Sequence, residues 1–415
     1  MSRKYTVTKL DTFENISLIV YGDKKYGDLL EGANPTAKLV RNPDNFRNWL
    51  VAVGTVLQVP DLVPETPRLT VTKGSDDITL RIGKREITEW ESLKIDHSLT
   101  SMSTIQAVIP FEDPTKETRG LLRPFTYEPV DTFIGNELQF NGTLVSVEPR
   151  VLPGVMRVVI GAYAKPGVLS DCTTAGREFS RMKLEDIIRS ICGPYSIPLV
   201  SAEDTGKAFD QKNISVDRRI MEFFVQLAQL KNMVINNTES GALRLYRPIA
   251  DGKPVATINA DSAPLVRVTP RFNARAYYSS ISGTAPTIPG FPGGNKTPLQ
   301  NPFLRGTFRP IYFTVKAENE AETASMVSSK ISRMFANACD YEVEMAGWED
   351  PSGALWKVNT MISLEYPRAM IYKPYKFLVS RVSFQVSANE KVTVLTLVVP
   401  GSYSGNIPAR LPWVE

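Results

Sequence analysis

The sequence predicts a multidomain α+β protein in which β-strands predominate. Three observations lead to this prediction. A chain of 415 residues with 42% hydrophobic residues has enough apolar side chains for about two to four domains. Short segments of alternating polar and apolar residues recur along most of the chain, between turns that contain many of its 30 prolines and 26 glycines. Only a few segments show the apolar spacing of an amphipathic helix.

Residues 1–65 are predicted to form the first domain, with the element order β-α-α-β. Segments Lys4–Thr8 and Thr55–Pro60 alternate as strands do, and a short helix is expected through Leu29–Ala33. The proline-bearing segment 60–67 cannot continue a helix or a central strand, and we interpret it as a semi-stiff linker. The first helix is indicated by apolar residues at helical spacing: Phe13, Ile16, Ile19 and Val20.

This N-terminal unit resembles the LysM fold along nearly its whole length. Two features depart from the usual pattern. Leu10 stands where a glycine normally precedes an Asp-Thr pair, and residues 36–47 form a long insert. The segments that carry the resemblance are 5–17, 20–23, 29–35 and 53–60.

Four residues match positions of the groove by which LysM-like domains hold N-acetylated glycans: Asp11, Thr12, Asn34 and Pro35. The resemblance implies that these positions contact peptidoglycan or dock another protein. The same residues also have an ordinary structural interpretation, because Asp11 or Thr12 can cap the first helix and Asn34-Pro35 can end the second. Both interpretations are open from the sequence.

Residues 66–175 are predicted to form a small β-barrel, because their short strands are separated by regular turns. Trp90 and the run Ile105–Ile109 are expected to face its core. The expected strands are Leu69–Thr72, Ile78–Ile82, Glu86–Leu93, Ser103–Ile109, Thr132–Ile134, Glu137–Val147 and Val155–Tyr163.

The pattern changes to helical spacing in residues 176–250, which are predicted to form an inserted α+β domain. Helices are expected at 181–192 and 217–231, the second capped by Asp217, followed by a hairpin over Met233–Tyr246. The apolar positions of the two helices are Leu184, Ile187, Ile188 and Ile191, and Ile220, Phe223, Phe224, Leu227 and Leu230.

Residues 251–415 are predicted to form a second β-barrel domain with one helix. The Pro/Gly-rich segment 283–300 is expected to be an exposed loop. The helix is expected at 318–338, with Ala321, Ala324, Val327, Ile331, Met334 and Phe335 on its apolar face. Strands are expected within 254–282 and at Tyr341–Ala346, Met361–Tyr366, Lys376–Ala388 and Lys391–Val399, the last two joined as a hairpin.

The residue composition argues against an enzyme, a metal site or a bound cofactor. The chain has one histidine, His97, and three widely spaced cysteines, so most Ser/His, Cys/His and zinc chemistries lack their residues. Strand alternation places His97 on the face of Ile95 and Leu99, which suits a half-buried structural histidine better than a catalytic one. The odd cysteine count predicts reduced thiols rather than a disulfide framework. With 48 Lys and Arg against 44 Asp and Glu, the net charge of +4 is too small for nucleic-acid coating.

The sequence also gives little support for glycoside hydrolysis or for phosphate binding. The densest acidic cluster near aromatic residues contains Glu342, Glu344, Glu349 and Asp350, which a glycosidase would need to hold as a carboxylate pair in a cleft. A solvated face or a subunit contact explains this cluster better. Gly293-Gly294 lacks the Lys-Ser/Thr of a phosphate-binding loop.

The order of the three regions beyond residue 70 resembles the baseplate hub proteins of contractile phage tails, including the late control protein D family, and of related injection machines. The resemblance covers roughly residues 70–405, and LysM-like units recur in tail baseplates as protein-binding adaptors. The most similar stretches are Lys183–Ile191, Asp217–Phe224 and Phe377–Pro400.

This resemblance implies a homotrimer in which each chain gives two similar barrels, so that three chains form a ring of six. Such a ring would join a sixfold tail tube to a threefold central spike, attach baseplate wedge proteins, and let DNA pass through its lumen. The expected location is the tail baseplate of the virion, after synthesis in the host bacterial cytoplasm. We expect neither a membrane-spanning segment nor a cleaved leader.

Two alternatives belong to other classes. One is a peptidoglycan-binding enzyme anchored to the cell wall by the LysM-like domain, and the other is a monomeric adhesin or glycan-binding module. The single histidine and the absence of a recognisable carboxylate pair or metal motif count against the enzyme, and the oligomeric state distinguishes the adhesin from a hub.

Overall fold

The computed structural model describes residues 3–21, 24–42, 49–59, 78–111, 116–152, 155–201, 203–262, 264–287, 293–295, 298–387 and 390–414. Two compact units are present. One comprises Met1–Arg68 with Pro110–Pro114 and Glu148–Val158, and the other comprises the remaining residues. The linker predicted at 60–67 and the strand predicted at 69–72 lie outside the described residues.

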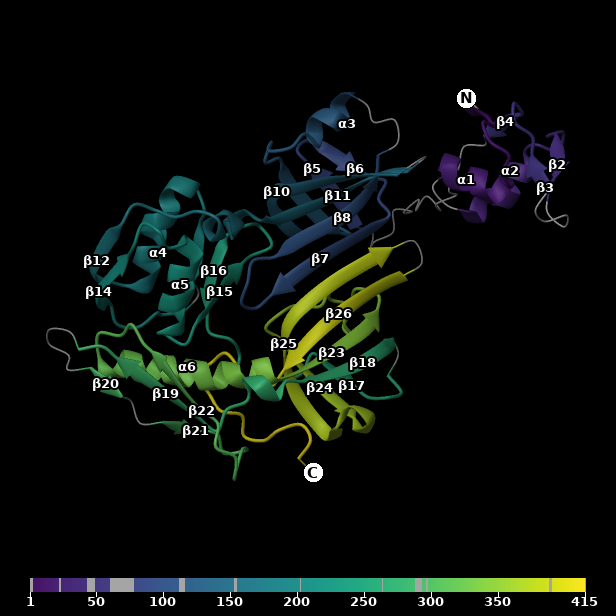
Figure 1. Ribbon diagram of the computed structural model, residues 1–415. Coiled ribbons are helices and arrows are strands. Elements are labelled where there is room, and N and C mark those ends of the chain that lie inside the picture. Colours follow the sequence, from purple (N-terminus) through teal and green to yellow (C-terminus); the bar gives the residue numbers. More distant parts are fainter. Residues whose placement is uncertain are drawn as a thin grey trace. The chain divides into compact units, whose positions relative to one another are not determined.

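The N-terminal unit has the predicted β-α-α-β order with one added hairpin (Figure 1). Strands β1 (Arg3–Thr6) and β4 (Val56–Val59) pair antiparallel, and α1 (Phe13–Tyr21), the 3₁₀ turn η1 (Lys24–Tyr26) and α2 (Gly27–Gly32) lie between them in the chain. The added pair of antiparallel strands consists of β2 (Leu39–Arg41), which lies in the insert, and β3 (Trp49–Val51), which follows it. Ile16 is buried as predicted, whereas Ile19 is 62% exposed because the apolar face of α1 is narrower than its sequence indicates. The core consists of Val7, Ile16, Tyr21, Leu30, Val51, Leu57 and Val59.

The two β-rich regions share one continuous 13-stranded sheet among the described residues, rather than forming two separate closed barrels. The first region gives β5 (Ile78–Ile82), β6 (Arg85–Ile87), β7 (Ser92–Ser98), β8 (Thr104–Pro110), β9 (Pro129–Ile134), β10 (Glu137–Leu152) and β11 (Val155–Ala164), and carries α3 (Lys116–Leu121). The second gives β17 (Ala256–Ile258), β18 (Leu265–Phe272), β23 (Cys339–Ala346), β24 (Met361–Tyr366), β25 (Ile371–Ser387) and β26 (Glu390–Val398).

The length of β25 explains why the two regions join. Its first half pairs with β24, and its second half, Arg381–Ser387, extends past β24 and pairs antiparallel with β7 on the same edge (Figure 1). On its other edge it forms the predicted hairpin with β26. Trp90 is buried as predicted, but the strand expected over Glu86–Leu93 is interrupted, because β6 ends at Ile87 and β7 begins at Ser92.

The inserted domain contains both predicted helices and the predicted hairpin. The helices are α4 (Leu184–Cys192) and α5 (Ile220–Gln229), and β15 (Val234–Asn237) pairs antiparallel with β16 (Leu243–Tyr246). Asp217 does not cap α5, because the helix starts later and its N-cap is Arg219, which makes no capping side-chain bond. The other elements are η2 (Lys165–Ser170), β12 (Arg177–Met182), η3 (Gly193–Tyr195), β13 (Leu199–Ser201) and β14 (Phe209–Ile214).

The predicted long helix is present as α6 (Glu320–Ala338), but it begins at Glu320 rather than at residue 318, and a different residue of its first turn is buried. Asn319 caps it by accepting a hydrogen bond from the backbone of Glu322. In the first turn Ala321 is exposed and Glu322 is buried, because Glu322 pairs with Lys212 of the inserted domain. Met326 of α6 joins the core formed by α4 and α5.

The segment 283–300 is not entirely a loop. It begins within β19 (Ser280–Ala285), and β20 (Gly294–Asn295) and β21 (Leu299–Gln300) both pair antiparallel with β19. The parallel strand β22 (Pro310–Thr314) completes this small sheet, which packs against α6. Along the chain, the short turn η4 (Ala274–Ala276) lies between β18 and β19, and η5 (Pro367–Ala369) lies between β24 and β25.

Candidate interaction surfaces

The first two predicted groove residues, Asp11 and Thr12, form the start of α1. Thr12 Oγ1 accepts a hydrogen bond of 3.3 Å from the backbone N–H of Asn15, as an N-cap side chain does. Asp11 Oδ1 accepts bonds from the backbone of Thr12 at 2.9 Å and from Asn15 Nδ2 at 2.6 Å. The polar atoms of both residues therefore stabilise the helix terminus.

The other two, Asn34 and Pro35, follow α2. Asn34 is buried and joins α2 to β4, because its Nδ2 donates to the carbonyls of Leu30 and Gln58, and its Oδ1 accepts from the backbone N–H of Gln58 at 2.6 Å. Pro35 is exposed. The structural role that the sequence analysis offered for Asn34 is thus present, and a glycan contact at these positions stays a prediction.

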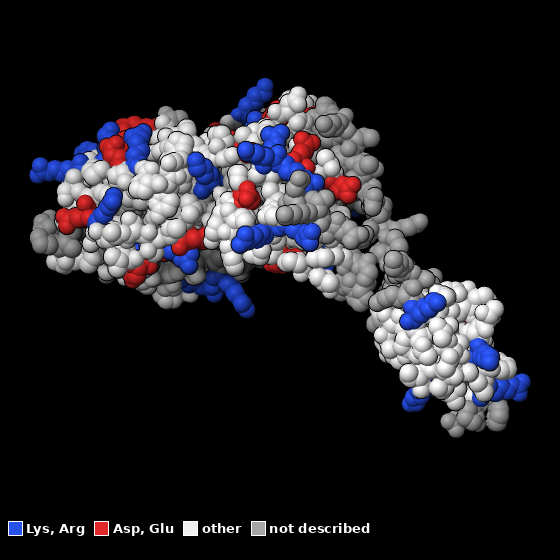
Figure 2. Space-filling model, turned by 90° about the horizontal axis from the view of Figure 1, so that it is seen from above, with Lys and Arg blue, Asp and Glu red and all other residues white. Residues whose placement is uncertain are grey.

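The hairpin β2–β3 is an exposed apolar feature that the sequence analysis did not identify. Leu39, Val40 and Trp49 are all exposed, Trp49 by 54%, and the Arg41 guanidinium lies 5.5 Å from the centre of the Trp49 ring. On the face of the N-terminal unit that Figure 2 shows, the charged side chains of the described residues are Lys and Arg, with no Asp or Glu. The available sequence signal was a pair of short apolar runs, Leu39-Val40 and Trp49–Val51, on either side of the turn-forming residues Asn42-Pro43-Asp44.

A second exposed feature is the loop between α3 and β9, which presents two aromatic side chains. Phe125 is 88% exposed, and both it and Tyr127 have positive φ angles, of 65° and 52°. L-residues with bulky side chains rarely adopt this conformation because the Cβ atom approaches the backbone. The loop and residues 144–147 of β10 line a surface hollow of about 430 Å³. Exposed aromatic residues of this kind are common at protein–protein interfaces.

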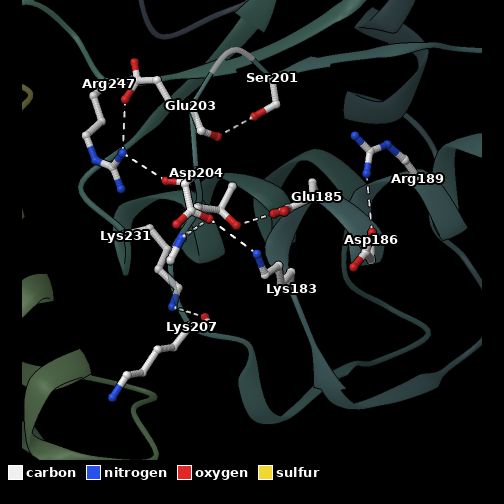
Figure 3. A network of polar contacts seen from close by, with 12 residues as sticks. Lys183, Glu185, Asp186, Arg189, Ser201, Glu203, Asp204, Lys207, Lys231 and Arg247 are labelled. Atoms are coloured by element: carbon white, nitrogen blue, oxygen red, sulfur yellow. Dashed lines mark hydrogen bonds and ion pairs between the residues drawn. The ribbon is translucent and has the colours of Figure 1, made fainter.

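The inserted domain carries a network of polar contacts on its surface (Figure 3). Arg247 Nη1 donates to Glu203 Oε2 at 3.0 Å and to the carbonyl of Asp204 at 3.1 Å, while Lys183 lies 3.4 Å from Asp204 Oδ1. The backbone N–H of Gly206 and the Lys183 ammonium lower the pKa of Asp204. Glu185 of α4 accepts a hydrogen bond from Thr205. These contacts tie residues 203–206 to the start of α4 and to the end of β16.

The acidic cluster considered for glycoside hydrolysis is largely paired or built into a turn. On β23, Glu342 and Glu344 lie beside arginines of β18, with Arg271 Nη1 3.0 Å from Glu342 Oε2 and Arg267 Nη2 2.7 Å from Glu344 Oε2. Asp350 Oδ1 accepts bonds from Ser352 and Ala354 in the turn that follows. Cross-strand ion pairs and turn formation account for these carboxylates.

His97 and the cysteines are arranged as structural residues. Burial lowers the pKa of His97 to about 4, and its Nδ1 lies 3.0 Å from Ser103 Oγ. Burial raises the pKa of the Cys192 and Cys339 thiols to about 12, which makes them poor nucleophiles at neutral pH. All three cysteines, including the half-buried Cys172, are unpaired. In the part of the chain that the structure describes, His, Cys, Asp and Glu form no group of three or more suited to a metal ion. Each described helix is too short or too polar to cross a bilayer.

Comparison with known proteins agrees with this architecture. Residues 166–247 match the family model "Baseplate hub protein gp44-like, second domain". The baseplate hub protein gp44 of Escherichia phage Mu is 21% identical over 342 residues, which cover 79% of this chain and 88% of that protein. The resemblance to phage baseplate hub proteins expected from the sequence is thereby confirmed.

Two solved structures share the fold. The 43 kDa tail protein of prophage MuSo2 from Shewanella oneidensis superposes with a TM-score of 0.67 at 19% identity, over 79% of this chain and 99% of that one. The tail protein from Neisseria meningitidis MC58 gives a TM-score of 0.66 at 15% identity, over 79% and 97%. At these identities the likeness establishes the fold alone.

Proposed function

We propose that this chain, a relative of phage baseplate hub proteins, is the structural hub of a tail baseplate and works as a homotrimer. The observation that carries the proposal is the fold itself: two β-rich regions in one sheet with an inserted α+β domain, in an arrangement shared with tail proteins over 79% of the chain. The four-part division at 1–65, 66–175, 176–250 and 251–415 is part of this proposal.

The trimer follows from a symmetry argument. A tail tube with sixfold symmetry and a spike with threefold symmetry can be joined by three chains if each chain presents two similar surfaces. The two β-rich regions, fixed to each other through β7 and β25, are suited to this role because their relative orientation is set by main-chain hydrogen bonds. At the ends of the main strand path, β6 and β18 each pair with one strand among the described residues, and strands at the ends of a sheet can take up a strand of a neighbouring subunit.

The proposed partners are the tail tube protein on one face of the ring, the central spike protein on the other, and baseplate wedge proteins at the periphery. DNA passes through the lumen only as cargo. The proposed location is the virion tail, after synthesis in the host bacterial cytoplasm, and the unpaired cysteines are compatible with a reducing compartment.

The N-terminal unit is proposed to attach neighbouring baseplate proteins. Its exposed hairpin β2–β3 supports protein docking, because Trp49 and Arg41 are residue types enriched at such interfaces. The alternative, an anchor that binds peptidoglycan next to an enzyme or a glycan-binding module, is less well supported. The polar groups of Thr12 and Asn34 are engaged within the fold, and Glu342 and Glu344 have arginine partners.

Negative-stain electron microscopy of the purified chain tests the proposal. The expected class averages show a ring with threefold symmetry and six similar lobes around a central channel. Particles of single-chain size without rotational symmetry would contradict it. In a separate pull-down, unchanged sacculus binding after replacement of Asp11, Thr12 and Asn34 by alanine would exclude a peptidoglycan contact through these three residues.

A further inference from the structure

The two β-rich regions have the same strand topology. In the first region, the strands β7 to β11 lie in the spatial order β7-β8-β11-β10-β9. In the second region, the order is β18-β23-β26-β25, and β24 pairs with β25. Taken in chain order, the strands of the two regions therefore correspond one to one, so that β7 matches β18, β9 matches β24 and β10 matches β25.

Within the chain, the two regions are joined by two of these strands. β25 continues past the first residue of β24 as Arg381–Ser387, and this part pairs antiparallel with β7. The loop before β24 takes part in the joint, because Trp356 is buried and lines a small pocket together with His97 and Ser98 at the end of β7.

A pair of equivalent hydrogen bonds aligns β10 with β25. The backbone N–H of Leu144 in β10 donates to the carbonyl of Glu128, the residue before β9, at 2.8 Å. In the same way, the backbone N–H of Val379 in β25 donates to the carbonyl of Thr360, the residue before β24, at 2.9 Å. Because the part of β25 that pairs with β7 begins two residues after Val379, the matching part of β10 is Ser146–Leu152.

The strands that match β25 and β7 both have a free edge. β10 pairs with β11 on one side, and on its other side the pairing with β9 stops at Thr143, opposite Pro129. β18 pairs with β23 on one side. In the part of the chain that the structure describes, no strand pairs with the other side of Ser146–Leu152 or of β18. Exposed apolar side chains lie on both strands: Val145 and Val151 on β10, and Val266 and Phe272 on β18.

Prolines are placed as free edges allow. The backbone N–H of Asn273 donates to the carbonyl of Ala338 at 2.8 Å. Because neighbouring residues of a strand direct their N–H groups to opposite sides, Arg271 also faces β23, and Pro270 faces the free edge. Prolines on free edges oppose pairing with unrelated strands. The matching part of β10 contains Pro149. Since prolines leave gaps in a hydrogen-bond ladder, buried side chains must supply much of the stability of a joint at these edges.

The loop before β9 and the end of β18 offer such side chains. Phe125 lies before β9 as Trp356 lies before β24, but Phe125 is 88% exposed and Trp356 only 3%. An apolar pocket of about 290 Å³ is present at the end of β18. An aromatic ring fits this space, because an apolar cavity of about 150 Å³ already binds benzene. The apolar lining of the pocket includes Phe272, Tyr277, Phe335, Met370, Leu411 and Trp413.

We propose that the joint between neighbouring subunits repeats the joint within the chain. Ser146–Leu152 of one copy pairs antiparallel with β18 of the next copy, and Phe125 enters the apolar pocket at the end of that β18. Each chain thus presents two different surfaces, and a head-to-tail contact of this kind can close into a ring. The inference rests on the proposed homotrimer and names the surfaces that form it.

The strand directions agree with this arrangement. In the internal joint, Arg381 at the start of the pairing segment lies opposite Ser98 at the end of β7. Ser146 accordingly lies opposite the Phe272 end of β18 in the joint between subunits. Ser146 and Phe125 line the same surface hollow, so the pairing brings Phe125 to the end of β18 that carries the pocket.

Photocrosslinking of the full chain with p-benzoylphenylalanine in place of Phe125 tests the joint. The expected products are covalent dimers and trimers on a denaturing gel, with crosslinks to segments 272–277 or 411–413 of another chain. The same probe in place of Val216, an exposed residue of the inserted domain, should not reach these segments. Light scattering on the same sample separates the two levels of the proposal. A trimer without crosslinks from position 125 to the pocket would overturn the joint and leave the trimer standing, whereas a monomer at every concentration would overturn both.

The variant Phe125→Asp provides a second test. A carboxylate in the apolar pocket is expected to raise the concentration at which half of the trimer dissociates by at least about tenfold. The far-UV circular dichroism of the chain should not change, because Phe125 is exposed within a single chain. The control Val216→Asp, at a site that is 66% exposed, should leave the trimer unchanged. A Phe125→Asp trimer as stable as the wild type would contradict the proposal.

Discussion

Replacing Lys212 with alanine is predicted to destabilise the junction between the inserted domain and α6. Lys212 Nζ lies 2.7 Å from Glu318 Oε1 and 3.0 Å from Glu322 Oε2, and the three side chains are only 8%, 15% and 9% exposed. The carboxylates also accept backbone bonds, Glu318 from Gln211 and Glu322 from Glu318. The ion triad is therefore a buried cross-link between β14 and the start of α6.

The size of the effect follows from what the substitution leaves behind. Removing one member of a buried ion pair costs about 3–5 kcal/mol, because the remaining charges are desolvated without compensation. Here two carboxylates about equally close to the ammonium lose their cation, so we expect a value in that range. At about 2–4 °C per kcal/mol for large domains, the unfolding midpoint should fall by roughly 10 °C.

Urea denaturation of the purified chain measures the loss, and hydrogen exchange localises it to β14 and the first turn of α6. The matched control is Arg189→Ala, which removes an exposed pair with Asp186 at 3.3 Å and should change stability by less than about 0.5 kcal/mol. A triple variant with Lys212→Met, Glu318→Gln and Glu322→Gln should recover most of the loss, since no buried charge remains. If Lys212→Ala lowered the free energy of unfolding by less than about 1 kcal/mol, the triad would not be a buried cross-link and the reasoning would fail.

Three further predictions concern other parts of the chain. Burial lowers the pKa of His97 from 6.5 in the unfolded chain to about 4 in the folded protein, so the unfolded state binds the proton more readily. The free energy of unfolding is therefore unaffected by His97 above pH 6.5. It should decrease by roughly 3 kcal/mol as the pH falls from 6.5 toward 4. Urea titrations at a series of pH values should show this loss in the wild type and not in His97→Gln, and parallel curves would contradict it. Thr12→Ala should lower the stability of the N-terminal unit by about 1 kcal/mol through loss of the α1 cap, and a circular-dichroism melt with no change would refute the capping role. Phe125→Gly should raise the melting temperature of the isolated chain by relieving the positive φ, worth about 1–2 kcal/mol, and should weaken subunit or partner association in sedimentation; a lower melting temperature would exclude strain at this position.

Local sequence patterns predicted most individual elements. The spacing of Leu184, Ile187 and Ile191 located α4 because one buried stripe on a helix needs this period. The hairpin β25–β26 was predicted from a different local pattern, two runs of alternating polar and apolar residues separated by a short turn. Such patterns depend only on residues close together in the chain.

The features that the sequence did not predict depend on distant partners. The pairing of β7 with β25 joins residues 92–98 to residues 381–387, and no local pattern specifies it. Glu322 is buried in place of Ala321 only because Lys212, far away in the chain, neutralises it. Helix α5 begins after Asp217, later than predicted, for a comparable reason. Its first residue, Ile220, is part of the core of the inserted domain.

The candidate sites also include one feature that local sequence predicted and others that depend on the folded structure. A helix cap at Asp11 or Thr12 was predicted from their position before an apolar helix, and in the structure Thr12 makes the capping bond. The surroundings of His97 were not predictable, because the residues around it come from four separate stretches of the chain. The exposed side of Phe125 likewise depends on a backbone conformation that the sequence does not reveal.

The solution mass of the purified protein, measured by multi-angle light scattering at several concentrations, decides whether the chain is a trimeric hub. A trimeric hub gives a stable species of three times the chain mass of 46.1 kDa, independent of concentration over the measured range. A species that stays at 46.1 kDa at every concentration would contradict the trimeric hub and favour the monomeric adhesin or glycan-binding alternative.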